Sequence, residues 1–223
     1  MHILATTTAS LDDLIEPVDL DQQPADMVAL SFSDSDLASL DRAAKADETL
    51  PDLRLAALRD LRHPMSVDLW VDRIASQAKV IVVRVLGGYD WWRYGCDRLG
   101  ETARRHGVKL ALLPGECRVE DERLAALSTM EPAERQALLA CFREGGTENM
   151  RRVVERMAML AGQERAVEEA EPLPRAGCYR QDEAGPGSPV LILFYRSMLL
   201  ADDVAPIDAL ADELATRGLK PVP

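Results

Sequence analysis

The densest group of side chains that could bind a ligand lies in one short stretch, from Gly87 to Gly95. It holds two of the three tryptophans of the chain and reads Gly87-Gly88-Tyr89-Asp90-Trp91-Trp92-Arg93-Tyr94-Gly95. A flat conjugated ligand can stack on such rings, an arginine can bind its carboxylate, and glycines let the backbone come close. The candidate contacts are Asp90, Trp92, Arg93 and Tyr94. Packing of Trp91 or Trp92 against a sheet explains the same residues and is the favoured interpretation.

A second pair of candidate contacts, Arg196 and Ser197, follows an apolar run that ends at Tyr195. Ligands of open parallel sheets bind outside the carboxyl ends of the strands, so a strand before Arg196 would place this pair at such an edge. Three further polar residues have simpler explanations. Asp34 and Asp36 are expected to cap a helix start, and His63 before a proline is expected in a turn.

The sequence predicts no catalytic residue, no metal site and no phosphate loop. Gly87-Gly88 before a helix matches neither a dinucleotide fingerprint nor a Walker motif. The histidines do not fall at metal-ligand spacing, and the cysteines form no Cys-x-x-Cys pair, so we expect reduced thiols. The cysteines are Cys96, Cys117, Cys141 and Cys178.

Short apolar runs alternate with helical patterns, which is typical of an α/β domain with a parallel sheet, flavodoxin-like or Rossmann-like. Strands are expected at 3–5, 27–32, 53–58, 80–85 and 108–113. Helices are expected from 33 to about 44, from Pro64, and over 91–106, 132–142 and 147–160. The loops after the strands would then gather at one edge of the sheet and carry any ligand site.

The pattern predicts three segments. Residues 1–162 form an α/β domain with two trailing helices, 163–189 form a linker rich in Glu, Pro and Gly, and 190–223 begin a second α/β domain. In that second part a buried strand at 190–195 precedes a helix at 206–217, and a further strand opens at Leu219 without being completed. A β-α-β unit of this kind leaves a sheet edge uncovered, so we expect the N-terminal piece of a longer protein.

The composition excludes several classes of function. The formal net charge is −12, which disfavours binding to nucleic acid or to anionic lipid. The longest apolar runs are far shorter than the roughly 18 residues of a membrane-spanning helix. The first residues lack a basic segment and a long apolar segment, so there is no sign of a secretion signal and we expect a cytoplasmic protein.

Several motifs together resemble the large subunit of cobaltochelatase, of the CobN type, which is related to the magnesium chelatase H subunit. They occur in the same order and cover the whole chain: 25–37, 63–69, 85–88 with 92–95, 112–115, 145–150, and 194–197 with 205–210. One departure is Asp202, where family members usually carry a glycine, and it leaves the backbone conformation of that loop open.

The resemblance implies a function for the longer protein. In that family the large subunit binds a tetrapyrrole and inserts the metal, and two further subunits form an ATP-hydrolysing AAA+ motor. For the cobalt branch the ring is hydrogenobyrinic acid a,c-diamide, in aerobic cobalamin synthesis. This chain would then use no cofactor of its own, would be inactive alone, and would help bind the ring. The alternative is a flavodoxin-like module that contacts partner subunits and never touches the ring.

Overall fold

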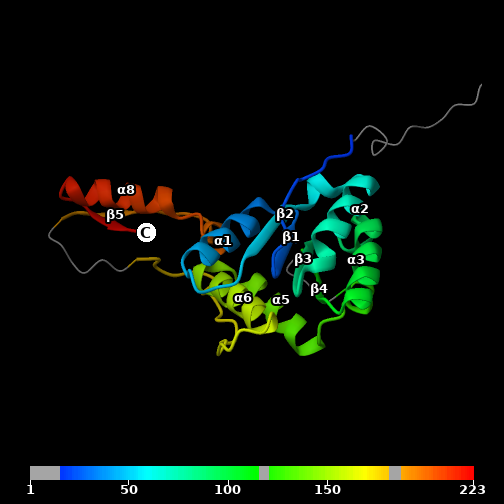
Figure 1. Cartoon of the computed structure of the whole chain (residues 1–223). Coiled ribbons are helices and arrows are strands. Elements are labelled where there is room, and N and C mark those ends of the chain that lie inside the picture. The colour runs from blue at the N-terminus through cyan, green and yellow to red at the C-terminus, as the bar shows by residue number, and fades with distance from the viewer. Residues whose placement is uncertain (1–15, 116–120, 181–186) are drawn as a thin grey trace, which may run out of the picture.

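The chain forms an α/β/α sandwich followed by a smaller β-α-β unit (Figure 1). The structure is a computed structural model and describes residues 16–115, 121–180 and 187–223. Four parallel strands form the main sheet in the order β2-β1-β3-β4. Their bounds are β1 Met27–Ser31, β2 Leu53–Ala57, β3 Val80–Val85 and β4 Lys109–Pro114. The parallel sheet with flanking helices confirms the predicted fold class.

Helices cover both faces of the sheet and account for its apolar composition. One face packs against α2 (Pro64–Arg73), α3 (Arg93–His106) and α4 (Glu122–Leu127). The other packs against α1 (Asp34–Lys45), α5 (Pro132–Glu144) and α6 (Gly146–Leu160). Every residue of β1 and of β3 is buried, as expected for central parallel strands covered on both sides. Among the described residues, none of the helices combines the length and apolar composition that crossing a membrane requires.

Local sequence signals set most of the element boundaries. The Ser33 side chain caps α1 by accepting a hydrogen bond from the Asp36 amide, and His63 caps α2 through Nδ1. The prediction that Asp34 and Asp36 cap this helix is wrong, because both lie inside α1 and their carboxylates pair with Arg59 and Arg84. Gly107 ends α3 in the left-handed conformation. The helix expected from 91 begins later, because Tyr89–Trp91 is a 3₁₀ turn and α3 begins only at Arg93. Helix α4 was not predicted, and the strand expected at 3–5 lies outside the described residues.

A buried ion pair joins the strand ends to the helices on one face. The guanidinium of Arg84, on β3, lies 2.9 Å from an Asp36 carboxylate oxygen, and the Arg84 side chain is only 7% exposed. Arg84 also donates to the Gly115 carbonyl after β4, and its guanidinium carbon lies 4.8 Å from the centre of the Phe142 ring of α5. Ser31 donates a further hydrogen bond to Asp36. The Arg84 side chain therefore links α1, β3, β4 and α5 at the carboxyl edge of the sheet.

Residues 187–223 form a small unit of two parallel strands and two helices. Strand β5 (Pro189–Leu191) pairs with β6 (Lys220–Val222), and α7 (Arg196–Leu200) and α8 (Ala205–Thr216) lie between them. The predicted buried strand at 190–195 is wrong in length and burial. The side chains of Leu191, Leu193 and Tyr195 are 70%, 91% and 82% exposed. Only one face of this segment packs inward, through Ile192, because the two-stranded sheet is covered by α8 alone.

Close backbone contact fixes this unit to the main domain. A side chain at Gly145, just before α6, would put its Cβ 2.8 Å from the Leu200 carbonyl oxygen, so only glycine allows this approach. Asp202 has a φ of 53°, the left-handed conformation that a glycine readily adopts. Its carboxylate pairs with Arg42 of α1 at 2.8 Å and accepts a hydrogen bond from Thr147 of α6. These contacts offset the conformational cost at Asp202.

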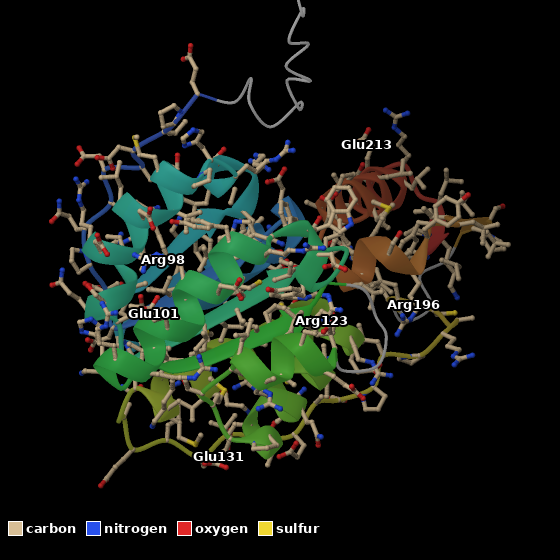
Figure 2. The ribbon with its side chains drawn as sticks, turned by 90° about the vertical axis from the view of Figure 1, so that its right-hand side faces the viewer. Arg98, Glu101, Arg123, Glu131, Arg196 and Glu213 are labelled. Carbon is tan, nitrogen blue, oxygen red and sulfur yellow. The ribbon has the colours of Figure 1, made fainter. Side chains whose placement is uncertain are left out.

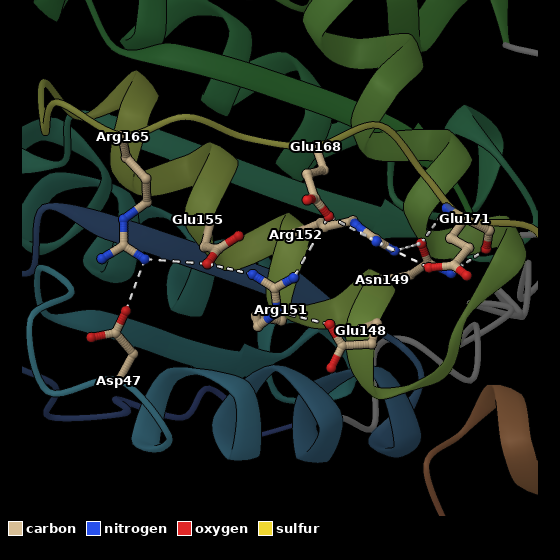
Figure 3. Close-up of polar contacts among 9 residues, drawn as sticks. All are labelled: Asp47, Glu148, Asn149, Arg151, Arg152, Glu155, Arg165, Glu168 and Glu171. Carbon is tan, nitrogen blue, oxygen red and sulfur yellow. Dashed lines mark hydrogen bonds and ion pairs between the residues drawn. The ribbon is translucent and has the colours of Figure 1, made fainter.

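The predicted linker contains no helix or strand over 163–180, but its first part is bound to the domain (Figure 3). Arg152 of α6, with a side chain only 8% exposed, lies 3.0 Å from Glu168 and 3.1 Å from Glu171. Arg165 lies 2.8 Å from Asp47, at the end of α1. Hydrogen bonds from Thr49 and Arg165 lower the pKa of Asp47 to about 2, so this contact weakens only as the pH falls towards that value.

We expect the substitution Arg84→Met to destabilise the domain by about 3–5 kcal/mol, because it leaves the Asp36 carboxylate partly buried without its cation. Arg59→Met is the matched control, since its ion pair with Asp34 is exposed and should contribute no resolvable stability. Urea denaturation followed by circular dichroism measures both. Equal midpoints for the two variants would show that the Arg84 pair does not hold the sheet edge together.

At Asp202 three substitutions separate backbone strain from charge. Asn tolerates the left-handed conformation but lacks the charge, Gly lacks both strain and charge, and Ala lacks the charge and is strained. We therefore expect Asp202→Ala to be less stable than Asp202→Gly by about 1–2 kcal/mol in chemical denaturation. If Ala and Gly were equally stable, Asp202 would not hold its φ of 53° in solution.

Candidate functional site

The aromatic cluster after β3 divides into a buried ring and an exposed one. Trp92 is 5% exposed, packs in the core beneath α2 and α3, and donates its indole N–H to the Leu61 carbonyl at 2.8 Å. Its ring therefore has no free face for a ligand in this structure, and the packing interpretation fits it. Its neighbour Trp91 is 72% exposed. The two adjacent tryptophans therefore differ, one lying in the core and the other on the surface.

The remaining candidates in this loop are exposed and engaged with each other. Arg93 lies 2.8 Å from Asp90, and Arg123 of α4 lies 3.2 Å from the same carboxylate. Tyr94 is 42% exposed and donates its hydroxyl to Asp68 at 2.7 Å, which raises the pKa of Tyr94. Asp90, Arg93 and Tyr94 stay predicted contacts, but both nearby guanidinium groups already have an acidic partner.

The carboxyl edge of the sheet offers two candidate positions for a ligand. The crevice between β1 and β3, where the strand order reverses, is the usual ligand position in such folds. Here the Arg84–Asp36 pair occupies the ends of these two strands. Beside it lies a pocket of about 340 Å³ whose lining includes Gly87, Asp90 and three residues of the α4 start, Asp121, Glu122 and Arg123. It is small and mostly acidic.

A larger hollow lies elsewhere, between α6 and the β5–β6 unit. We call it the junction cavity: it has a volume of about 660 Å³ and is lined by parts of 145–149, 171–179, 191–204 and 222–223. Its walls are mainly apolar, with Leu173, Leu193 and Phe194 among them. Volume and lining fall within the range of small-molecule sites, which are concave, largely apolar and about 300–1,000 Å³.

Of the second predicted pair, Arg196 lines this cavity and Ser197 does not, and neither lies directly after a strand. Arg196 opens α7, five residues beyond the end of β5, and donates to the carbonyls of Leu173 and Pro174 at 2.9 and 3.0 Å. Figure 2 shows it on α7, apart from the helices that carry Arg98 and Arg123. Its guanidinium thus fixes the strand-free segment that forms one cavity wall, while Ser197 is exposed in the first turn of α7.

Sequence reasoning did not find the junction cavity, because its walls come from segments far apart in the chain. Gly145 and Gly146 in its wall both have positive φ, at 63° and 80°. Arg175 and Cys178 fell in the predicted linker and were not predicted as ligand contacts, although both line the cavity. Within the described parts of the chain, no three His, Cys, Asp or Glu side chains lie close enough to hold a metal ion.

Comparison with known proteins finds a matching family model and sequence relatives that carry the same name. The family model described as CobN/Magnesium Chelatase matches residues 139–223, a range that contains every residue of the junction cavity. An aerobic cobaltochelatase subunit CobN from a Sinorhizobium species is 34% identical over 248 residues, covering 100% of this chain and 19% of the relative. The corresponding subunit of Pseudomonas aeruginosa is 35% identical over 239 residues with the same coverage.

A solved structure agrees with these sequence relatives. The catalytic subunit of cobaltochelatase from Mycobacterium tuberculosis superposes with a TM-score of 0.70 at 26% identity, over 88% of this chain and 16% of that one. The chain spans about a fifth of the length of the CobN relatives that it matches. The resemblance found in the motifs is confirmed, and the chain belongs to the CobN/magnesium chelatase family.

Proposed function

We propose that this chain is an N-terminal part of the large subunit of an ATP-dependent cobaltochelatase, which inserts cobalt into hydrogenobyrinic acid a,c-diamide in aerobic cobalamin biosynthesis. The observation that carries the proposal is similarity over the whole chain to two aerobic cobaltochelatase subunits, at 34% and 35% identity. Cobalt is a substrate of this reaction, and ATP hydrolysis is assigned to two AAA+ partner subunits. The chain alone would neither hydrolyse ATP nor insert cobalt.

Within that reaction, the chain would help to bind the tetrapyrrole. The ring is broad and partly apolar and carries carboxylates and amides at its edge, so its site needs apolar walls and a few polar groups that fix orientation. A cavity of about 660 Å³ with apolar walls supports this role. The exposed ring of Trp91 beside Asp90, Arg93 and Tyr94 offers a second surface.

The interaction-module alternative also has a supporting observation. Trp92 is buried, and the Arg84–Asp36 pair occupies the strand ends where a flavodoxin-like fold usually binds its ligand. A domain whose sheet edge is closed in this way fits a role in contacting other subunits. The two functions are distinguished by whether the chain binds the ring at all.

We expect an absorbance titration of the 223-residue chain with hydrogenobyrinic acid a,c-diamide to saturate at one ring per chain, because burial of the ring changes its surroundings. The variant Trp92→Ala is unsuitable for testing ring binding. Removing this core tryptophan lowers the stability of the domain by about 3–5 kcal/mol and disturbs the fold. The variant Arg93→Ala is suitable for testing ring binding, because the Arg93 side chain is 64% exposed. Failure of the wild-type chain to bind the ring, with its circular dichroism spectrum intact, would favour the interaction module.

A further inference from the structure

The cavity at the junction of α6 with the β5–β6 unit is lined by one arginine without a partner among the described residues. Five charged residues line it, and four have partners: Glu148 pairs with Arg151, Glu171 with Arg152, Asp202 with Arg42, and Arg196 with two carbonyls. Arg175 is the exception. It is exposed, and within the described residues its guanidinium has neither an ion pair nor a hydrogen bond.

An unpaired cation matters because the chain as a whole is acidic. A formal net charge of −12 repels an anionic ligand, so binding an acid requires a local positive charge that no carboxylate neutralises. The loop after β3 does not provide one, since Arg93 and Arg123 share Asp90, and Asp121 and Glu122 lie beside them. Arg175 at the rim of an apolar cavity does provide one.

The backbone around the cavity also supplies hydrogen-bonding groups, in addition to the charge of Arg175. Ile192 donates to Val222, and Lys220 donates to Ser188, both at 3.0 Å, so in this parallel pair the N–H and C=O of Leu191 face away from β6. Leu191 lines the cavity, as does the amino-terminal turn of α6. These groups suit the amides of a ligand, while Leu193 and Phe194 suit its apolar face.

We propose that the junction cavity is the tetrapyrrole site of this chain, with the apolar face of the ring against Leu193 and Phe194 and a ring carboxylate bound by Arg175. This inference rests on the proposed function and narrows it to one site. Arg196 is a positioning residue, because its bonds to Leu173 and Pro174 hold the segment that carries Arg175. The loop after β3 then takes no part in holding the ring.

Two ring probes separate charge from apolar contact: hydrogenobyrinic acid a,c-diamide and the same ring with its carboxylates methylated. We expect the wild-type chain to bind the acid at least tenfold more tightly than the ester. Arg175→Ala should lose most of that preference, and Arg175→Lys should restore part of it. Leu193→Ser should weaken both probes equally, and its fold should survive because Leu193 is 91% exposed. Arg217→Ala, just after α8 and outside the cavity, is the control for net charge.

Alkylation of Cys178 reports the position of the ring directly. Cys178 is exposed and lines the cavity, whereas burial raises the pKa of Cys96 to about 12 and that of Cys141 as well, so those thiols should not react. In a Cys117→Ser background, bound ring should slow alkylation of Cys178. Slowed alkylation and loss of acid preference in Arg175→Ala would support the cavity.

Three other outcomes would overturn this assignment. If the ring binds but Arg175→Ala behaves like Arg217→Ala and Cys178 stays fully reactive, the ring lies elsewhere and only the proposed function survives. If Arg93→Ala, rather than Arg175→Ala, loses the acid preference, the site is the loop after β3. If neither probe binds the folded wild-type chain, the ring-binding function fails together with its location.

Discussion

The ion pair between Arg84 and Asp36 determines how the carboxyl edge of the sheet is used. An arginine inside an otherwise apolar strand must find a partner, because an isolated buried charge is very costly. Asp36 supplies the charge, Gly115 supplies a carbonyl, and the Phe142 ring covers the guanidinium. The pair stabilises the contact of α1 and α5 with the strand ends. It also occupies the position where a related fold would admit a ligand.

With that edge closed, the place for a ligand moves to the boundary between the domain and the β5–β6 unit. Close contacts fix the two parts against each other at this boundary. Gly145 lies against the Leu200 carbonyl. Asp202 adopts a glycine-like conformation and bonds to Arg42 and Thr147. Arg196 and the ion pairs of Arg152 then hold residues 168–175 as a cavity wall. The proposed ring site therefore depends on contacts between segments that are distant in sequence.

Strands and helices that depend on local sequence pattern were predicted, whereas contacts between residues far apart in the chain were missed. The apolar run at Val80–Val85 and the helical patterns that begin at 33 and end at 106 located main elements correctly. No pattern pairs Arg84 with a residue 48 positions away, or tells which of two adjacent tryptophans turns inward. Arg175 was missed for a different reason. Its Pro- and Glu-rich surroundings resemble a linker, and the ion pairs of 163–171 and the hydrogen bonds from Arg196 show that the segment is bound.

The central claim, that the ring binds at the junction cavity and not at the strand ends, is tested most directly by amide chemical shifts. A heteronuclear NMR titration of the isotope-labelled chain with hydrogenobyrinic acid a,c-diamide would report every backbone amide at once. We expect the largest shifts at 145–149, 173–179 and 191–194, with 87–94 nearly unchanged. The largest shifts at 87–94, with the cavity residues unmoved, would contradict the account.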